Sequence, residues 1–161
     1  MIHINIPFIA LLLQGIPEQI AVATLAFAIA RISFKWKKIF IISTVLAFSA
    51  YLARLSQITF EIHTVLLIIL LFVILLTLEK VDLSLAFLSS LLSFLTLAVF
   101  EYISVSILMP VFKITPEIIV TNFTIRILIG EPHVLLIFLF ALILGHVRKR
   151  GKIDEFLGKY Q

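Results

Sequence analysis

Eight ionisable side chains in an otherwise apolar chain are the residues best suited to bind a ligand. Glu101 lies within an apolar run, between Phe100 and Tyr102. A charge inside a membrane-spanning helix is costly, so it usually faces a protein interior or water and pairs with another charge. Arg54 and Arg126 offer the opposite charge. We expect one ligand-binding group, the outer cluster, formed by Glu18, Arg54, Glu61, His63, Glu101, Arg126, Glu131 and His133.

The sequence gives little support for a catalytic site or a metal-binding site. The chain has no cysteine, which excludes thiolate zinc sites, iron–sulfur clusters and cysteine nucleophiles. The four histidines lack the spacing of metal ligands, and no glycine-rich loop could cradle a phosphate. We therefore expect a protein that is not an enzyme and that uses no metal ion or other cofactor.

The composition is that of a membrane protein. Hydrophobic residues make up 62% of the 161 residues, charged residues only 14%, and the mean hydropathy is +1.22. Soluble domains are roughly half apolar and a quarter charged. Residues 65–76 do not alternate in polarity as the strands of a membrane barrel do, so helices are the remaining spanning structure.

Apolar runs separated by charged turns predict an all-α, polytopic transmembrane bundle. Pro17-Glu18 is a common helix opening, because proline tolerates the first position and a carboxylate favours the positive end of the helix dipole. Gly130-Glu131-Pro132-His133 predicts a restart before the last span. We expect five spans, at residues 17–34, 39–55, 65–77, 83–108 and 134–147, and one interfacial or re-entrant helix within residues 111–130. Residues 4–13 could span, join the first helix or lie in the interface.

The distribution of basic residues predicts the orientation. Ten of the thirteen Lys and Arg residues fall on one face of this topology. Cytoplasmic loops are rich in Lys and Arg, so we expect the N-terminus outside, the C-terminus inside and the eight ionisable residues near the outer leaflet.

Residues 1–147 would form the membrane domain and residues 148–161 a short basic tail. Nucleic acid is an unlikely partner, and the tail would contact anionic lipid or a cytoplasmic protein through Arg148, Lys149, Arg150 and Lys152.

Some of these residues also have an ordinary structural interpretation. Glu61, Glu131 and His133 lie at expected helix ends, where exposed charges are common. The spacing of Ser89 and Ser93 resembles the small-residue pattern that lets transmembrane helices pack closely.

The order Gly15-Ile16-Pro17-Glu18, Arg54, Ile62-His63-Thr64, Glu101 and residues 126–132 resembles the membrane-embedded sensor region of Firmicutes histidine kinases of the GHKL type. This class includes peptide quorum-sensing receptors. In such kinases a similar number of membrane helices precedes a cytoplasmic dimerisation helix and an ATPase domain. Residues 148–161 leave no room for those domains, so we expect a bacterial sensor module without kinase activity.

These features together predict a multi-pass protein of the cell membrane that acts as a sensor. It would bind a small ligand, peptide or lipid headgroup at the outer cluster and signal to a cytoplasmic protein, as a homo-oligomer or as part of a membrane complex. One alternative is a transporter or channel subunit. Transporters often contain interrupted helices, and the sequence predicts such interruptions at residues 15–17 and 130–132. The other is a structural or assembly subunit whose charges pair internally.

Overall fold

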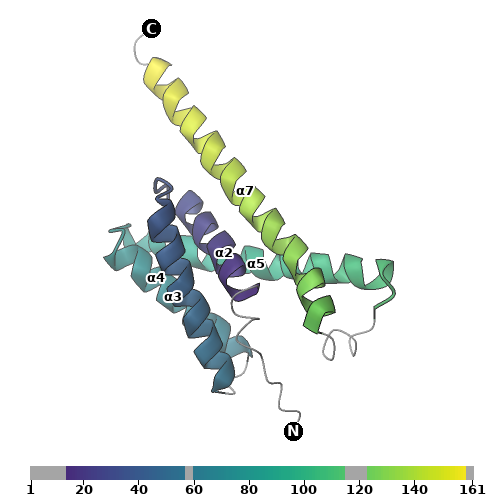
Figure 1. Cartoon of the computed structure of the whole chain (residues 1–161). Coiled ribbons are helices and arrows are strands. Elements are labelled where there is room, and N and C mark those ends of the chain that lie inside the picture. The colour runs from purple at the N-terminus through teal and green to yellow at the C-terminus, as the bar shows by residue number, and fades with distance from the viewer. Residues whose placement is uncertain (1–13, 57–59, 115–122, 159–161) are drawn as a thin grey trace.

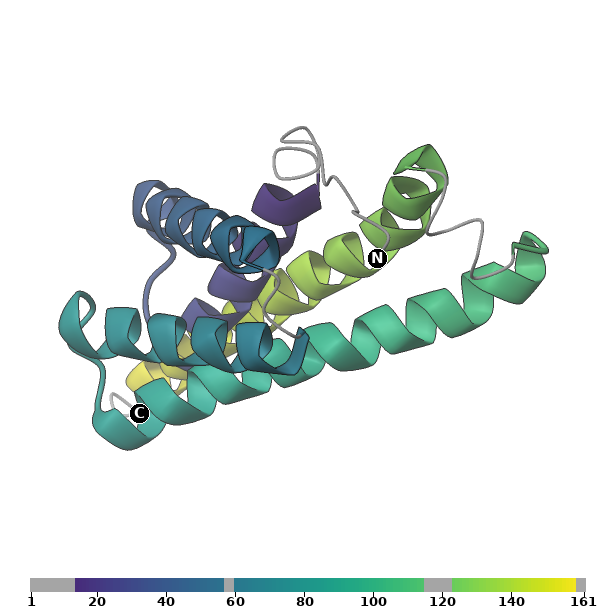
Figure 2. The same ribbon diagram turned by 90° about the horizontal axis from the view of Figure 1, so that it is seen from below.

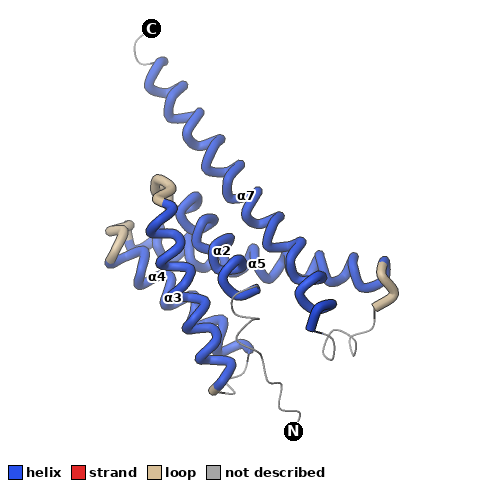
Figure 3. The backbone as a smooth tube through the Cα atoms, in the orientation of Figure 1, coloured by secondary structure: helices blue, strands red, loops and turns tan. Residues whose placement is uncertain are grey.

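The described part of the chain is entirely helical (Figures 1 and 3). The structure is a computed structural model, and it describes residues 14–56, 60–114 and 123–158. The helices are α2 (Ile16–Ile29), α3 (Trp36–Leu55), α4 (Phe60–Thr77), α5 (Leu83–Val111) and α7 (Phe123–Gly158). The predicted all-α fold class is confirmed.

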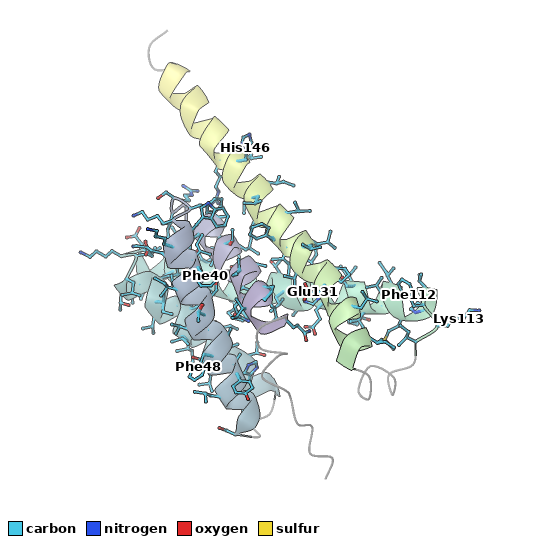
Figure 4. All side chains as sticks on the ribbon, in the orientation of Figure 1. Phe40, Phe48, Phe112, Lys113, Glu131 and His146 are labelled. Carbon is cyan, nitrogen blue, oxygen red and sulfur yellow. The ribbon has the colours of Figure 1, made fainter. Side chains whose placement is uncertain are left out.

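Within the described residues, three segments are long and apolar enough to cross a membrane: Trp36–Ala53, Leu83–Val111 and Gly130–Arg148. Two further apolar helices, Ile16–Ile29 and Ile62–Thr77, are shorter. These lengths and compositions indicate a membrane protein. Long apolar side chains cover much of its surface, among them Phe40, Phe48 and Phe112, which Figure 4 labels.

α2 is the central helix of the molecule. Gln19 and all of residues 21–28 are buried, and the helix packs against α3, α5 and α7. A helix that is apolar around its whole circumference is typically buried. Its alanines allow neighbouring helices to approach closely. Pro17 and Glu18 lie in its first turn, as the helix opening predicts.

α2 is shorter than the span expected over residues 17–34, because the chain turns after Ile29. Arg31 has φ 60°, and the amide of Ile32 donates to the carbonyl oxygen of Phe27 at 3.0 Å. This is the Schellman pattern, in which glycine is the usual residue at the left-handed position. Lys80 and Lys113 occupy left-handed positions after α4 and α5, with φ 53° and 54°. A basic residue there is favoured by the negative end of the helix dipole.

α5 lies beside α4 and runs across α2 and α7 (Figures 1 and 2). Its buried side includes Ala86, Ser89, Ser90 and Ser93. The hydroxyls of Ser89 and Ser93 donate to carbonyl oxygens four residues earlier, at 2.6 and 2.7 Å. Their hydroxyls are therefore satisfied within α5, and both side chains are buried in the protein.

α7 differs most from the prediction. The span expected over residues 134–147 lies within the apolar segment Gly130–Arg148, but the expected restart at Gly130–His133 is wrong, because one helix runs from Phe123 through Gly130 and Pro132 to Gly158. The interfacial or re-entrant helix expected within residues 111–130 stays a prediction. Residues 115–122 lie outside the described residues. Proline in a membrane helix is tolerated where neighbouring helices compensate for the lost backbone hydrogen bond. α7 packs here against α2 and α5, which overrides the local breaking signal.

Replacing Lys80 by glycine should stabilise the protein. A left-handed backbone costs a residue with a side chain roughly 1 kcal/mol more than glycine. We expect Lys80→Gly to raise the thermal unfolding midpoint in detergent. Ala98→Gly, at an exposed position within α5, should lower the midpoint because glycine costs about 1 kcal/mol in a helix interior. A lower midpoint for Lys80→Gly would contradict this assignment.

Candidate functional site

α2 and α7 run roughly parallel and pack together, and α7 continues beyond the end of α2 (Figure 1). At one end, a Cβ placed on Gly130 would lie 2.7 Å from Nε2 of Gln14, just before α2. At the other end, the Arg148 guanidinium donates to the carbonyl oxygens of Ala28 and Ile29, the second at 2.8 Å. The two helices run in the same direction. The part of α7 around Gly130 therefore lies beside the start of α2, and the part around Arg148 lies beside its end.

One stripe of α7 faces the protein interior. Gly130, His133, Val134, Ile137 and Ala141 are all buried. Their spacing of three and four residues places them on a single side of a helix. His133 therefore lies on the same side as Gly130, which meets Gln14, and it points into the protein.

Buried polar atoms gather at this end of the α2–α7 contact. His133 is 2% exposed, and among the described residues neither of its ring nitrogens has a hydrogen-bond partner. Oε1 of Gln19 on α2, a residue that is also 2% exposed, and Oε1 of Glu131 on α7 are likewise buried without a hydrogen-bond partner in the described part of the chain. We call Gln14, Glu18, Gln19, Glu131 and His133 the polar site.

Two side chains of the polar site on α2 are joined by a hydrogen bond. Nε2 of Gln19 donates to Oε1 of Glu18 at 3.3 Å. The backbone carbonyl of Gln19 accepts a hydrogen bond from the Ser43 hydroxyl at 3.1 Å, which fixes α3 against α2 at this level. A buried polar atom left without a partner costs about 1–3 kcal/mol. The unpartnered atoms of Gln19, Glu131 and His133 are thus suited to bind a polar molecule.

Three members of the predicted outer cluster belong to the polar site. Glu18 lies in the first turn of α2, and Glu131 and His133 lie on α7, which packs against α2 and α5; Figure 4 labels Glu131. His63 is buried on α4, which packs against α3 and α5. Glu101 is exposed on α5, outside its buried stripe. For the other three members only the backbone is described, so a cluster of all eight stays a prediction; these are Arg54, Glu61 and Arg126.

Sequence reasoning missed Gln19 and the close approach of Gln14 to Gly130. The sequence did contain a signal, because small and apolar residues from Gly130 to Ala141 recur at the spacing of one helix face. The helix break expected at Pro132 separated these residues into two elements, so they were not recognised as one face. The sequence alone also did not indicate which side chains of α2 this face would cover.

The basic residues gather at the opposite end of the molecule. Lys38 Nζ lies 2.5 Å from Oε1 of Glu79, whose side chain is only 5% exposed. This ion pair joins the start of α3 to the end of α4, while Arg148 joins α7 to the end of α2. Arg148 is thus occupied within the chain. The side chains of Lys149, Arg150 and Lys152 are outside the description, and their contacts with a partner stay predictions.

The described residues include no group of three or more His, Asp or Glu side chains placed to hold a metal ion. The polar site instead offers an imidazole, an amide and carboxylates, which bind by hydrogen bonds and charge.

The two glycines of α7 should respond differently to alanine. A Cβ on Gly130 meets the end of the flexible Gln14 side chain, whereas a Cβ on Gly145 would lie 2.5 Å from the ring of Phe34. Alanine favours a helix over glycine by about 1 kcal/mol, but overpacking costs about 1–3 kcal/mol. We expect Gly130→Ala to hold or raise the thermal unfolding midpoint and Gly145→Ala to lower it. Equal midpoints would contradict the Phe34 contact.

Comparisons with family models, with curated proteins and with solved structures find no match to this chain.

Proposed function

We propose that this chain is a non-enzymatic sensor of the bacterial cell membrane that binds a small ligand at the polar site. The observation that carries the proposal is His133, a fully buried imidazole with no hydrogen-bond partner among the described residues. Buried polar groups in proteins are nearly always hydrogen-bonded, and exceptions often mark functional sites or a bound molecule. A ligand that bonds to His133, Gln19 and Glu131 would satisfy all three.

The ligand is small and rich in hydrogen-bond donors. The unpartnered atoms of Gln19 and Glu131 are acceptor oxygens. A neutral imidazole supplies one acceptor and one donor. An amine, a hydroxyl compound or the polar end of a peptide would match this set, whereas an acidic ligand would oppose the carboxylates.

The polar site lies on the outer side of the membrane in this proposal. Basic residues at the opposite end support that orientation, because Lys and Arg are enriched on the cytoplasmic side. Lys35, Lys37 and Arg31 are exposed there. Lys38 joins the start of α3 to the end of α4, and Arg148 joins α7 to the end of α2.

The α2–α7 pair would carry the signal from the polar site to the basic end. A ligand can shift a conformational equilibrium only through different contacts in the two states. A small slide of α7 along α2 would change the contacts of His133 and those of Arg148 together, because both are on one continuous helix. A cytoplasmic protein would then read the position of the residues after Arg148.

A transporter is less well supported than a sensor. That alternative depends on interrupted helices at residues 15–17 and 130–132. Gly15 has helical backbone angles, φ −64° and ψ −45°, and α7 runs through Gly130 and Pro132 without a break. A structural subunit remains the other candidate, and it makes an opposite prediction about His133.

The test is native mass spectrometry of the full chain purified in mild detergent. We expect a bound small molecule in the wild type that is lost in His133→Leu. The matched control is His146→Leu, since His146 is exposed on the same helix and far from Glu131 (Figure 4). That control should retain the molecule.

A second measurement separates the sensor from a structural subunit. Loss of the ligand should lower the thermal unfolding midpoint of His133→Leu relative to the liganded wild type. If the wild type carries no molecule, and leucine raises the midpoint by removing an unsatisfied buried group, the sensor proposal is wrong. Gln19→Leu serves as the second variant if His133→Leu does not fold.

A further inference from the structure

An open apolar groove lies beside the last turns of the α7 span. It has a volume of about 460 Å³ and is lined by Phe34, Leu142, Ile143, Gly145, His146 and Val147. The groove exists because Gly145 has no side chain, which lets the ring of Phe34 rest directly on the helix. It is distinct from the polar site, which is at the other end of the α2–α7 contact.

Aromatic side chains mark one wall of this groove as an interfacial surface. Trp36 is 51% exposed, and its ring centroid lies 5.9 Å from that of Phe34 and 6.1 Å from that of Phe138. Tryptophan is enriched at the level of lipid headgroups. The groove therefore runs from the apolar part of α7 toward the membrane surface.

Cations border the groove at this surface. Lys35 and Lys37 are exposed and flank Trp36 in the chain, and Lys35 directly follows Phe34, which lines the groove. Glu79, a carboxylate at this end of the molecule, is already paired with Lys38. An apolar groove that ends near lysines with no ion-pair partner among the described side chains matches a molecule with an acyl chain and a negative headgroup.

We infer that this groove binds one anionic phospholipid. An acyl chain lies against Phe34, Ile143 and Val147, and the phosphate lies near Lys35 and Lys37. A zwitterionic lipid offers the same acyl chain without net negative charge, so the site prefers anionic lipid. This binding is independent of a ligand at the polar site.

The test uses Trp36, the single tryptophan of the chain, as a reporter. The full chain is reconstituted in phosphatidylcholine vesicles to which brominated phosphatidylglycerol or brominated phosphatidylcholine is added in equal amounts. Bromine quenches tryptophan fluorescence on contact. We expect stronger quenching by the anionic lipid, with its relative affinity falling roughly five-fold for each lysine removed in Lys35→Gln and Lys35→Gln/Lys37→Gln.

One further variant tests the groove itself, and two others are its controls. Val147→Phe adds bulk at an exposed position of the groove and should abolish the preference. Leu136→Phe, three turns earlier on the same exposed side of α7, and Lys113→Gln, at the far end of α5, should leave it unchanged (Figure 4). Equal quenching by both lipids in the wild type would overturn the inference. So would loss of the preference in the lysine variants without an effect of Val147→Phe, since that result indicates only general surface charge.

Discussion

The burial of α2 on all sides is the constraint on which the rest of the structure depends. A buried helix still has unpaired backbone carbonyls at its end, and these need partners inside the protein. Arg148 supplies two charged hydrogen bonds to the carbonyls of Ala28 and Ile29. Gly130 permits the close approach of Gln14 at the other end. α7 is thereby held parallel to α2, and α3 and α5 cover the remaining sides.

This arrangement separates two kinds of chemistry along one pair of helices. The polar site retains buried atoms without partners, while the basic end uses its charges in internal contacts and in a surface suited to lipid headgroups. Each unsatisfied atom costs about 1–3 kcal/mol, which a bound molecule would recover. An energy of that size is sufficient to shift an equilibrium between two positions of α7 several-fold. The coupling proposed for the sensor depends on α7 being one continuous helix.

Much of the fold could be predicted from the sequence, but the site only in part. Apolar runs and charged turns indicated the helices, and Pro17-Glu18 marked the start of α2. The continuity of α7 was missed because Gly130 and Pro132 disfavour a helix locally, and packing overrides that preference. Glu131 and His133 were identified from their type. The burial of Gln19 was missed because it depends on the packing of helices far apart in the chain; Arg148 meets Ala28 at a separation of 120 residues.

Cysteine crosslinking between α2 and α7 tests the central claim most directly. The chain has no cysteine, so introduced pairs have no background reaction. In native membranes, a short bismaleimide should join Gln14→Cys to Gly130→Cys efficiently. It should not join Gln14→Cys to Gly145→Cys, because Gly145 lies near Phe34 at the other end of the contact. Efficient crosslinking of the second pair, or none of the first, would contradict the parallel α2–α7 pair.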